Sequence, residues 1–458
     1  MTDITSTYSA GPLLLIAVGA VALLLLLIMR FKVHAFLALT LVSIITALVT
    51  KVPYDKIVST MLSGFGSTLA SVALLVGLGA MIGRLLEVTG GANVLADTLI
   101  SKFGEKRAPF ALGIASLLFG FPIFFDAGLV VMLPIIFSVA KRFGGSTLKY
   151  ALPSAGAFAV MHALLPPHPG PVAASELLGA NIGLMVLVGA VIALPTWYFG
   201  SYLFGLVAGS KFVLPLPSLF TDDVDVDETH TPPRFGIVLS VLLLPLLLIS
   251  LDTLLNTLTV AKVINGGDVW VQSLRMLGKT PVALLITVFF ALWIFSRERS
   301  MKHLQKVCDG ALGPVCSIIL VTGAGGMFGG VLRASGIGNA LAEMLSDTGL
   351  PVIVAAFIVS AALRVAQGSA TVALTTTAAL MAPTVAATAG LSQFDLCFIV
   401  VAIAGGATVL SHVNDSGFWL VGRFLEMDEK TTLKTWTVME TLLGTIAFLL
   451  AGLGSLFL

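Results

Sequence analysis

The chain has 458 residues, of which 57% are hydrophobic and only 11% are charged, and its formal net charge is +1. Soluble domains carry about 25% charged residues, so this composition predicts a polytopic α-helical membrane protein, and the near-neutral charge gives no reason to expect nucleic acid as a partner. A membrane β-barrel would show alternating segments of about ten residues, which this sequence lacks. Its three cysteines form no disulfide or metal-ligand spacing, so we expect no metal site and no cofactor; they are Cys308, Cys316 and Cys397.

The predicted membrane spans begin near the N-terminus. Residues 11–29 form an apolar run long enough to cross a bilayer, which takes about 20 residues, and no positive charge precedes the run as it would in a signal peptide. Arg30 and Lys32 follow this run, so the positive-inside rule places residues 30–34 in the cytoplasm and the N-terminus outside. Further apolar segments are expected at residues 35–50, 64–86, 109–140, 182–207, 236–255 and 281–296.

The connections between these segments differ in character. Residues 51–56 are expected to form a short external connection, and residues 90–108 an amphipathic interfacial helix followed by a loop. The acidic stretch at 209–234 predicts a solvated linker, and Gly266–Lys279 is expected to be a loop. The basic cluster at 297–306 should face the cytoplasm.

The second half of the chain repeats the first. When Gly64 is aligned with Gly310, other glycines and one asparagine coincide: Gly77 with Gly323, Gly83 with Gly329, Gly90 with Gly336, and Asn93 with Asn339. The first copy begins outside the membrane and the second begins inside, so the repeats should be inverted, as in many secondary transporters. We therefore predict N-terminal scaffold spans at 1–63, a first repeat at 64–208, a linker with connecting spans at 209–309, and a second repeat at 310–458.

Each predicted repeat contains two polar interruptions of its apolar sequence. They lie at 119–128 and 162–175 in the first repeat, and at 363–371 and 411–419 in the second. A broken backbone at membrane depth survives only where it is buried in protein or lines a wet cavity. Four such breaks predict two re-entrant hairpins and two discontinuous helices.

The break at 162–175 is rich in proline. Pro166, Pro167, Pro169 and Pro171 remove four backbone donors and push their preceding residues out of the α region. His162 and His168 flank this break. The stretch is interpreted as half of a transport site, and the alternative is a proline-rich loop outside the membrane.

Two isolated charges fall in the other breaks. Asp126 lies in apolar sequence, where a charge should face a cavity or a partner; it is a candidate proton carrier, cation ligand or ion-pair partner, or a carboxylate at the headgroup interface. Arg364 offers a planar fork suited to a carboxylate. It either grips an anionic substrate or neutralises Asp126 or Asp415.

The remaining candidates surround Arg364 and Asp415. Gly368, Ser369 and Thr371 precede an apolar helical run, so Ser369 or Thr371 either only caps this helix or also helps its N-terminus bind an anion. Polar side chains in both breaks are candidates for substrate hydroxyls, and histidines are candidates for proton relay, although a single histidine is also often structural. These are Gln367, Asn414 and Ser416 for the substrate, and His162, His168 and His412 for relay.

Three motifs carry a family resemblance. The segments 165–171 (LPPHPGP), 368–372 (GSATV) and 411–419 (SHVNDSGFW) resemble the gluconate permease family of bacterial sugar-acid/proton symporters, within the wider ion transporter superfamily. The resemblance covers essentially the whole chain and implies an inner-membrane homodimer with a fixed scaffold and a mobile, elevator-type transport part. The family often has Glu where this chain has Asp126, and a shorter acid would alter coupling or pocket size.

We therefore expect a multi-pass secondary transporter, not an enzyme. It would import gluconate or a related sugar acid with protons, binding substrate at Arg364, Gln367, Gly368, Ser369, Thr371, His168, Asn414 and Ser416 and coupling protons at Asp126, His162, His412 and Asp415. The alternative is a sodium-coupled or exchange carrier of another small hydroxy or amino acid, such as D-serine, which the family also transports. A membrane enzyme is disfavoured because no nucleophile–base motif stands out, and a channel would not drive uphill uptake.

Overall fold

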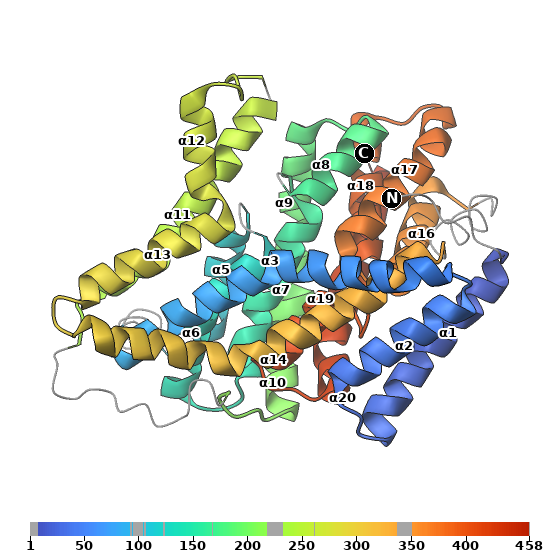
Figure 1. The fold of residues 1–458 in the computed structure, drawn as a ribbon. Helices are drawn as coiled ribbons and strands as arrows, with labels where there is room; N and C mark the ends of the chain where they lie inside the picture. Colours follow the sequence, from blue (N-terminus) through green and yellow to red (C-terminus); the bar gives the residue numbers. More distant parts are fainter. Residues whose placement is uncertain are drawn as a thin grey trace. The chain divides into compact units, whose positions relative to one another are not determined.

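A computed structural model describes residues 8–91, 94, 104, 107–121, 124–166, 168–217, 232–260, 262–336 and 350–457. Every regular element in these ranges is a helix (Figure 1). Seven of the helices are long and apolar enough to cross a membrane, or eight if one bent pair counts as a single span. The prediction of an all-α polytopic membrane protein is therefore confirmed.

The described chain forms two compact units. The first unit consists of Met1–Ala70, Ala163–Ser201 and Ile318–Leu458, and the second of Ser71–His162 and Tyr202–Ser317. The predicted inverted repeats and their boundaries stay a prediction. Residues 93 and 339, the acidic linker from 218 to 231 and most of the predicted interfacial helix lie outside the described residues.

The first unit holds the N-terminal helices and most of the C-terminal third of the chain. Within it, α16, α17 and α18 pack together, α8 packs on α17, and α21 packs along α18 (Figure 1). Its elements are α1 (Ala10–Leu25), η1 (Leu26–Arg30), α2 (Ala35–Val49), α8 (Pro169–Leu178), α9 (Ile182–Trp197), α16 (Val352–Gln367), α17 (Ala370–Ala387), α18 (Gln393–Thr408), α19 (Ser416–Phe424), α20 (Glu429–Thr432), η5 (Leu433–Thr437) and α21 (Val438–Phe457).

The second unit holds the middle of the chain. Its elements are α5 (Ala108–Gly120), α6 (Phe125–Phe143), α7 (Leu148–Leu164, whose last two residues belong to the first unit), α10 (Phe204–Lys211), α11 (Phe235–Val260), α12 (Val269–Gly278) and α13 (Thr280–Phe295). Besides α7, three helices contribute to both units: α3 (Tyr54–Val88), α14 (Met301–Ala334) and the short π-helix η3 (Tyr198–Leu203).

The four predicted interruptions are all breaks between helices. α5 ends at Gly120 and α6 starts at Phe125, while α7 ends at Leu164 and α8 starts at Pro169. In the C-terminal part, α16 ends at Gln367 and α17 starts at Ala370, and α18 ends at Thr408 before α19 starts at Ser416. Proline or glycine stands at the first three breaks, as local backbone chemistry predicts, whereas the α18–α19 break holds neither and was predicted from its polar residues.

The prediction of a loop at Gly266–Lys279 is wrong for most of its length, because α12 occupies Val269–Gly278. Only the start is a turn, in which the Asn265 side chain accepts from the Gly267 amide (3.0 Å). Asp252 of α11 holds the helix by pairing with Arg275 (2.9 Å) and Lys279 (2.8 Å). These ion pairs join residues far apart in the sequence, so local sequence patterns do not predict them.

The connection predicted between the second and third apolar segments is also too long. The connection expected at 51–56 ends early because α3 begins at Tyr54, and a positive φ of 58° at Lys51 makes the turn. The basic cluster at 297–306 is partly helical, because α14 begins at Met301.

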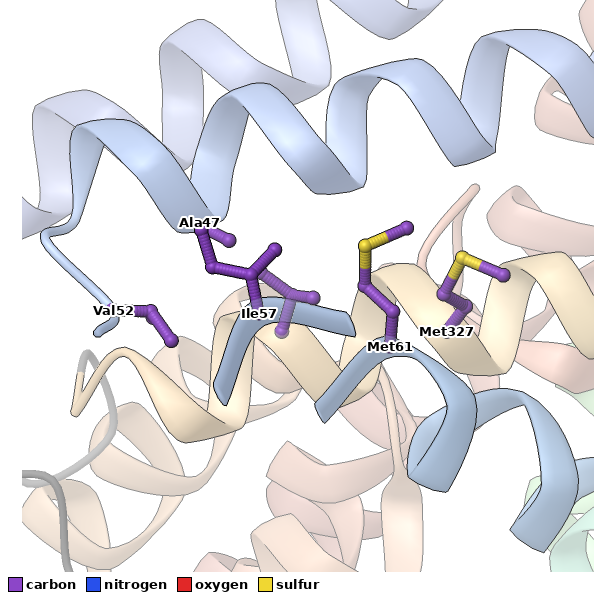
Figure 2. Close-up of a cluster of buried hydrophobic side chains, with 6 residues drawn as sticks. Ala47, Val52, Ile57, Met61 and Met327 are labelled. Atoms are coloured by element: carbon purple, nitrogen blue, oxygen red, sulfur yellow. The ribbon is translucent and has the colours of Figure 1, made fainter. Parts of the chain in front are cut away.

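Small residues let α3 and α14 approach closely within the first unit. A Cβ on Gly64 would lie 2.8 Å from the carbonyl oxygen of Gly326, and one on Gly330 would lie 3.0 Å from the Cα of Gly64. Beside this crossing, apolar side chains from α2, the α2–α3 turn, α3 and α14 form a buried cluster (Figure 2), made of Ala47, Val52, Ile57, Met61, Met327 and Val331. Close backbone approach through glycine is the usual way in which membrane helices pack, and it positions the C-terminal half of α14 beside the breaks described next.

Candidate functional site

The α16–α17 break and the α18–α19 break meet within the first unit. Gly368 ends α16 with a φ of +78°, and a Cβ on it would lie 2.1 Å from the carbonyl oxygen of Asn414. A Cβ on Gly329 of α14 would lie 3.0 Å from the same Asn414 oxygen and 3.2 Å from the Gln367 carbonyl. Glycine is therefore required for both the backbone conformation and the contact.

A buried ion pair joins the two breaks. One terminal nitrogen of Arg364 donates to Oδ2 of Asp415, and the other donates to the carbonyl of Gly368. Arg364 is 3% exposed and Asp415 is 8% exposed. The structure thus pairs Arg364 with Asp415, while a contact of Arg364 with an anionic substrate stays a prediction.

Further hydrogen bonds hold Asp415 in place. Its Oδ1 accepts from the amide of Gly417 (3.1 Å), which makes it the N-cap of α19, with Ser416 as the first residue of that helix. Its Oδ2 also accepts from the hydroxyl of Ser411, which in turn accepts from the indole nitrogen of Trp436 (2.8 Å). A buried carboxylate needs this kind of complete satisfaction, because desolvation costs several kcal/mol per ion.

Val365 provides the second link between the breaks. Its carbonyl accepts from the side-chain amide of Asn414 (2.8 Å) and lies 3.0 Å from Nε2 of His412. Arg333 of α14 donates to the carbonyl of Gln367 (3.3 Å). The last carbonyls of α16, which lack helical partners, are thus satisfied by side chains from other segments.

Four buried polar atoms in these breaks lack a hydrogen-bond partner among the described residues. They are Oε1 of Gln367, Oδ1 of Asn414, Nδ1 of His412 and Nε of Arg364. Each unsatisfied buried group costs about 1–3 kcal/mol, and such a group calls for an explanation in a native protein. Two are amide acceptors and one is a guanidinium donor, a set that matches a ligand carrying hydroxyl and carboxylate groups.

Ser369 caps α17. Its hydroxyl accepts from the amide of Val372 (3.4 Å), so the capping prediction is confirmed for Ser369, while Thr371 lies in the first turn of the helix. The alternative that this N-terminus also binds an anion stays a prediction. Nearby, α8 packs on α17, and a Cβ on Gly170 would lie 3.3 Å from the Leu374 side chain. His168, the residue before α8, is 3% exposed, so its side chain is buried in the first unit.

Asp126 and His162 belong to the second unit. Asp126 lies half-buried in the first turn of α6. The ring of Phe124, two residues earlier, lies 5.6 Å from the His162 ring at the end of α7. A Cβ on Gly128 would overlap Phe158 of α7 at 2.2 Å, so the break before α6 packs directly against α7. The structure thus brings these two candidates to neighbouring segments and gathers the other ten in the first unit.

Glu440 was not among the candidate site residues predicted from the sequence. This residue lies in the first turn of α21 and is 5% exposed. Coulombic interactions reach its carboxylate from Arg364 and Asp415. The signal was available, because a lone carboxylate in an apolar helix should face a cavity or partner, the same reasoning that singled out Asp126. Within the described chain, no three His, Cys, Asp or Glu side chains gather into a metal-binding group.

The fold and site define a class. Apolar helices that break inside the first unit, with a buried ion pair and unsatisfied polar atoms at the breaks, form a polytopic membrane protein with an internal polar site, the arrangement found in secondary transporters. A family model described as GntP family permease matches residues 11–457, nearly the whole chain. The chain belongs to this family, as its motifs predicted, and is a multi-pass protein of the bacterial inner membrane.

Curated relatives agree over nearly their whole lengths. The chain is 38% identical over 449 residues to the inner membrane permease YgbN of Escherichia coli, covering 96% of this chain and 97% of that one. It is 36% identical over 450 residues to a gluconate permease of Pseudomonas aeruginosa, covering 97% and 98%, and 37% identical over 440 residues to the low-affinity gluconate transporter of Escherichia coli, covering 95% and 96%. A solved structure, the YdaH transporter of Alcanivorax borkumensis, has a TM-score of 0.43 at 14% identity and covers 89% and 90%.

Proposed function

We propose that the protein is a symporter that imports gluconate or a closely related sugar acid with protons across the inner membrane. The observation that carries this proposal is the set of unsatisfied polar atoms around the buried Arg364–Asp415 pair. The names of several relatives at 33–37% identity support gluconate as the first substrate to test. Inverted repeats, an elevator movement and a homodimer remain part of the proposal.

Each polar group has a role in this proposal. Oε1 of Gln367 and Oδ1 of Asn414 are acceptors, so they suit the hydroxyl donors of a sugar acid. The substrate carboxylate would meet the start of α17 at Ser369 and Thr371, where the helix dipole favours an anion. Arg364 already pairs with Asp415, so it would contribute positive potential and the N–H of its Nε, which has no partner among the described residues. His168 and Ser416 complete the proposed substrate site.

Proton coupling is assigned to Asp126, His162, His412 and Asp415. In proteoliposomes with an inward pH gradient, we expect saturable, uphill gluconate uptake that does not respond to a sodium gradient. Asp126→Asn is expected to lose accumulation, because an amide cannot carry the proton. Full accumulation by that variant would remove Asp126 from coupling. Uptake driven by sodium at fixed pH would replace the proposal with a sodium-coupled carrier, and turnover of the substrate without accumulation would point to an enzyme.

A further inference from the structure

α21 brings a second carboxylate to the ion pair of the first unit. Glu440 is 5% exposed, and its Oε1 has no hydrogen-bond partner among the described residues. Arg364 and Asp415 act on it through Coulombic interactions. The buried charges at this point are therefore one guanidinium and two carboxylates.

Local contacts fix the face that α21 presents. Thr437 donates to the carbonyl of Ser411, and the Thr441 hydroxyl accepts from the amide of Leu410 (3.2 Å). Trp436 donates to the Ser411 hydroxyl (2.8 Å). Residues three and four apart share one face of a helix, so Glu440 lies on the same face as Trp436 and Thr437. That face is turned toward the α18–α19 break.

Contacts between glycines bring α21 close to α18. A Cβ on Gly444 would lie 2.3 Å from the carbonyl of Gly405, and a Cβ on Gly405 would lie 2.6 Å from the carbonyl of Gly444. The helices therefore touch backbone to backbone one turn beyond Glu440. This packing leaves little room for solvent around the carboxylate.

The other titratable groups near α21 are few. On α18, Asp395 lies in the first turn and Cys397 in the second. α18 runs antiparallel to α21, because Phe398 meets Gly454 while Val409 meets Gly444. Both residues therefore lie toward the far end of α21. α9 contributes no titratable residue, and Lys434 on η5 is exposed. Within the break itself, His412 is the remaining titratable group, beside Arg364 and Asp415.

The buried charges of Arg364, Asp415 and Glu440 do not balance when both carboxylates are ionised. With both carboxylates ionised, the buried group carries a net charge of −1, and two carboxylates in one site resist simultaneous ionisation. One added proton makes the group neutral. We propose that Glu440 is a proton-binding site that shares the transported proton with Asp415. This inference rests on the proposed proton-coupled function.

Protonation of Glu440 affects the contacts that Arg364 makes with both breaks. A proton on a Glu440 carboxylate oxygen leaves Arg364 paired with Asp415 and Gly368. When that proton leaves, the Glu440 anion competes for the guanidinium, whose Nε has an unused N–H. This competition weakens the contacts that join the two breaks, so proton release and substrate release are coupled.

Transport by Glu440→Gln in proteoliposomes tests the proposal. A gradient of about one pH unit supports roughly tenfold accumulation per coupled proton. We expect Glu440→Gln to lose this accumulation. Relative to wild type, its gradient-driven accumulation should fall by a factor about ten times larger than its gluconate counterflow, which is measured without a pH gradient. Glu176→Gln is the matched control, because Glu176 is an exposed carboxylate on α8 in the same unit. It should keep both activities.

A second measurement reads the proton directly. Infrared spectra of the purified wild-type protein in lipid should show a protonated-carboxyl band that titrates with pH and is absent in Glu440→Gln. If Glu440→Gln does not fold, Glu440→Asp should keep coupling with a shifted pH dependence of accumulation. Wild-type accumulation by Glu440→Gln, or an unchanged carboxyl band in that variant, would overturn the assignment and leave the proposed function intact. If wild-type uptake ignores the pH gradient, the proposed function fails, and the infrared band still decides whether Glu440 binds a proton.

Discussion

The Arg364–Asp415 pair gives the sharpest prediction for stability. In Asp415→Asn the amide keeps nearly the same shape, and its oxygen can still accept from the Gly417 amide (3.1 Å). The change removes the negative charge that pairs with Arg364, which is 3% exposed. Removing one partner of a buried ion pair leaves an uncompensated charge and costs about 3–5 kcal/mol. We expect a loss of stability of that size.

Reversible unfolding of the detergent-solubilised protein provides the assay, with a double-mutant cycle that adds Arg364→Gln. Because the double variant removes both members of the ion pair, its cost should be smaller than the sum of the single costs by roughly 0.5–3 kcal/mol. Asp252→Asn is the control. Its partners Arg275 and Lys279 have side chains 26% and 55% exposed, so water screens the pair and its loss should cost about 1 kcal/mol or less. Equal costs for Asp415→Asn and Asp252→Asn, or additive costs in the cycle, would refute the reasoning.

Two further predictions concern the backbone of the break and a helix cap. Gly368→Ala should destabilise the protein much more than Gly179→Ala: both glycines have positive φ, but an added Cβ meets the Asn414 carbonyl at 2.1 Å in the first case and nothing within 4 Å in the second. Unfolding of the two variants checks this, and equal losses would contradict it. Asp428 caps α20, and hydrogen bonds from Thr431, first from its side chain, hold the pKa of this carboxyl below its usual value of 3.8. Its contribution to stability is therefore present above that value and is lost as pH falls through the lowered pKa. The difference in unfolding free energy between wild type and Asp428→Asn, measured from pH 7 downward, should be constant at neutral pH and vanish in strong acid. A difference that grows on acidification would contradict the lowered pKa of Asp428.

Local sequence was enough to locate the four helix breaks, three of them by proline or glycine and the α18–α19 break by its polar residues. Proline cannot continue a helix, and glycine favours the left-handed backbone, so both act at the positions where they occur in the sequence. Gly368 and Ser369 illustrate this, since one ends α16 and the other caps α17. The same locality explains the failure at α12, where ion pairs from Lys279 and Arg275 to Asp252 of another helix hold a segment that was expected to be a loop.

The partners of the buried charges depend on long-range contacts. From the sequence, the partner of Arg364 could be an anionic substrate or one of two carboxylates. The structure pairs it with Asp415, which lies 51 residues away in the chain. It also adds Glu440, which a scan for interruptions passes over because α21 is continuous. Asp126 and His162 come to neighbouring segments through the Phe124 ring, a contact that no spacing rule predicts.

The sequence by itself determined the class of protein, its family, the helix breaks and most polar residues near them. These follow from composition, from the roughly 20 apolar residues that a bilayer span requires, and from backbone rules that operate over a few residues. Only the tertiary structure decided which polar groups meet. That outcome depends on close packing at glycines such as Gly405 and Gly444, which sets distances between helices far apart in the chain.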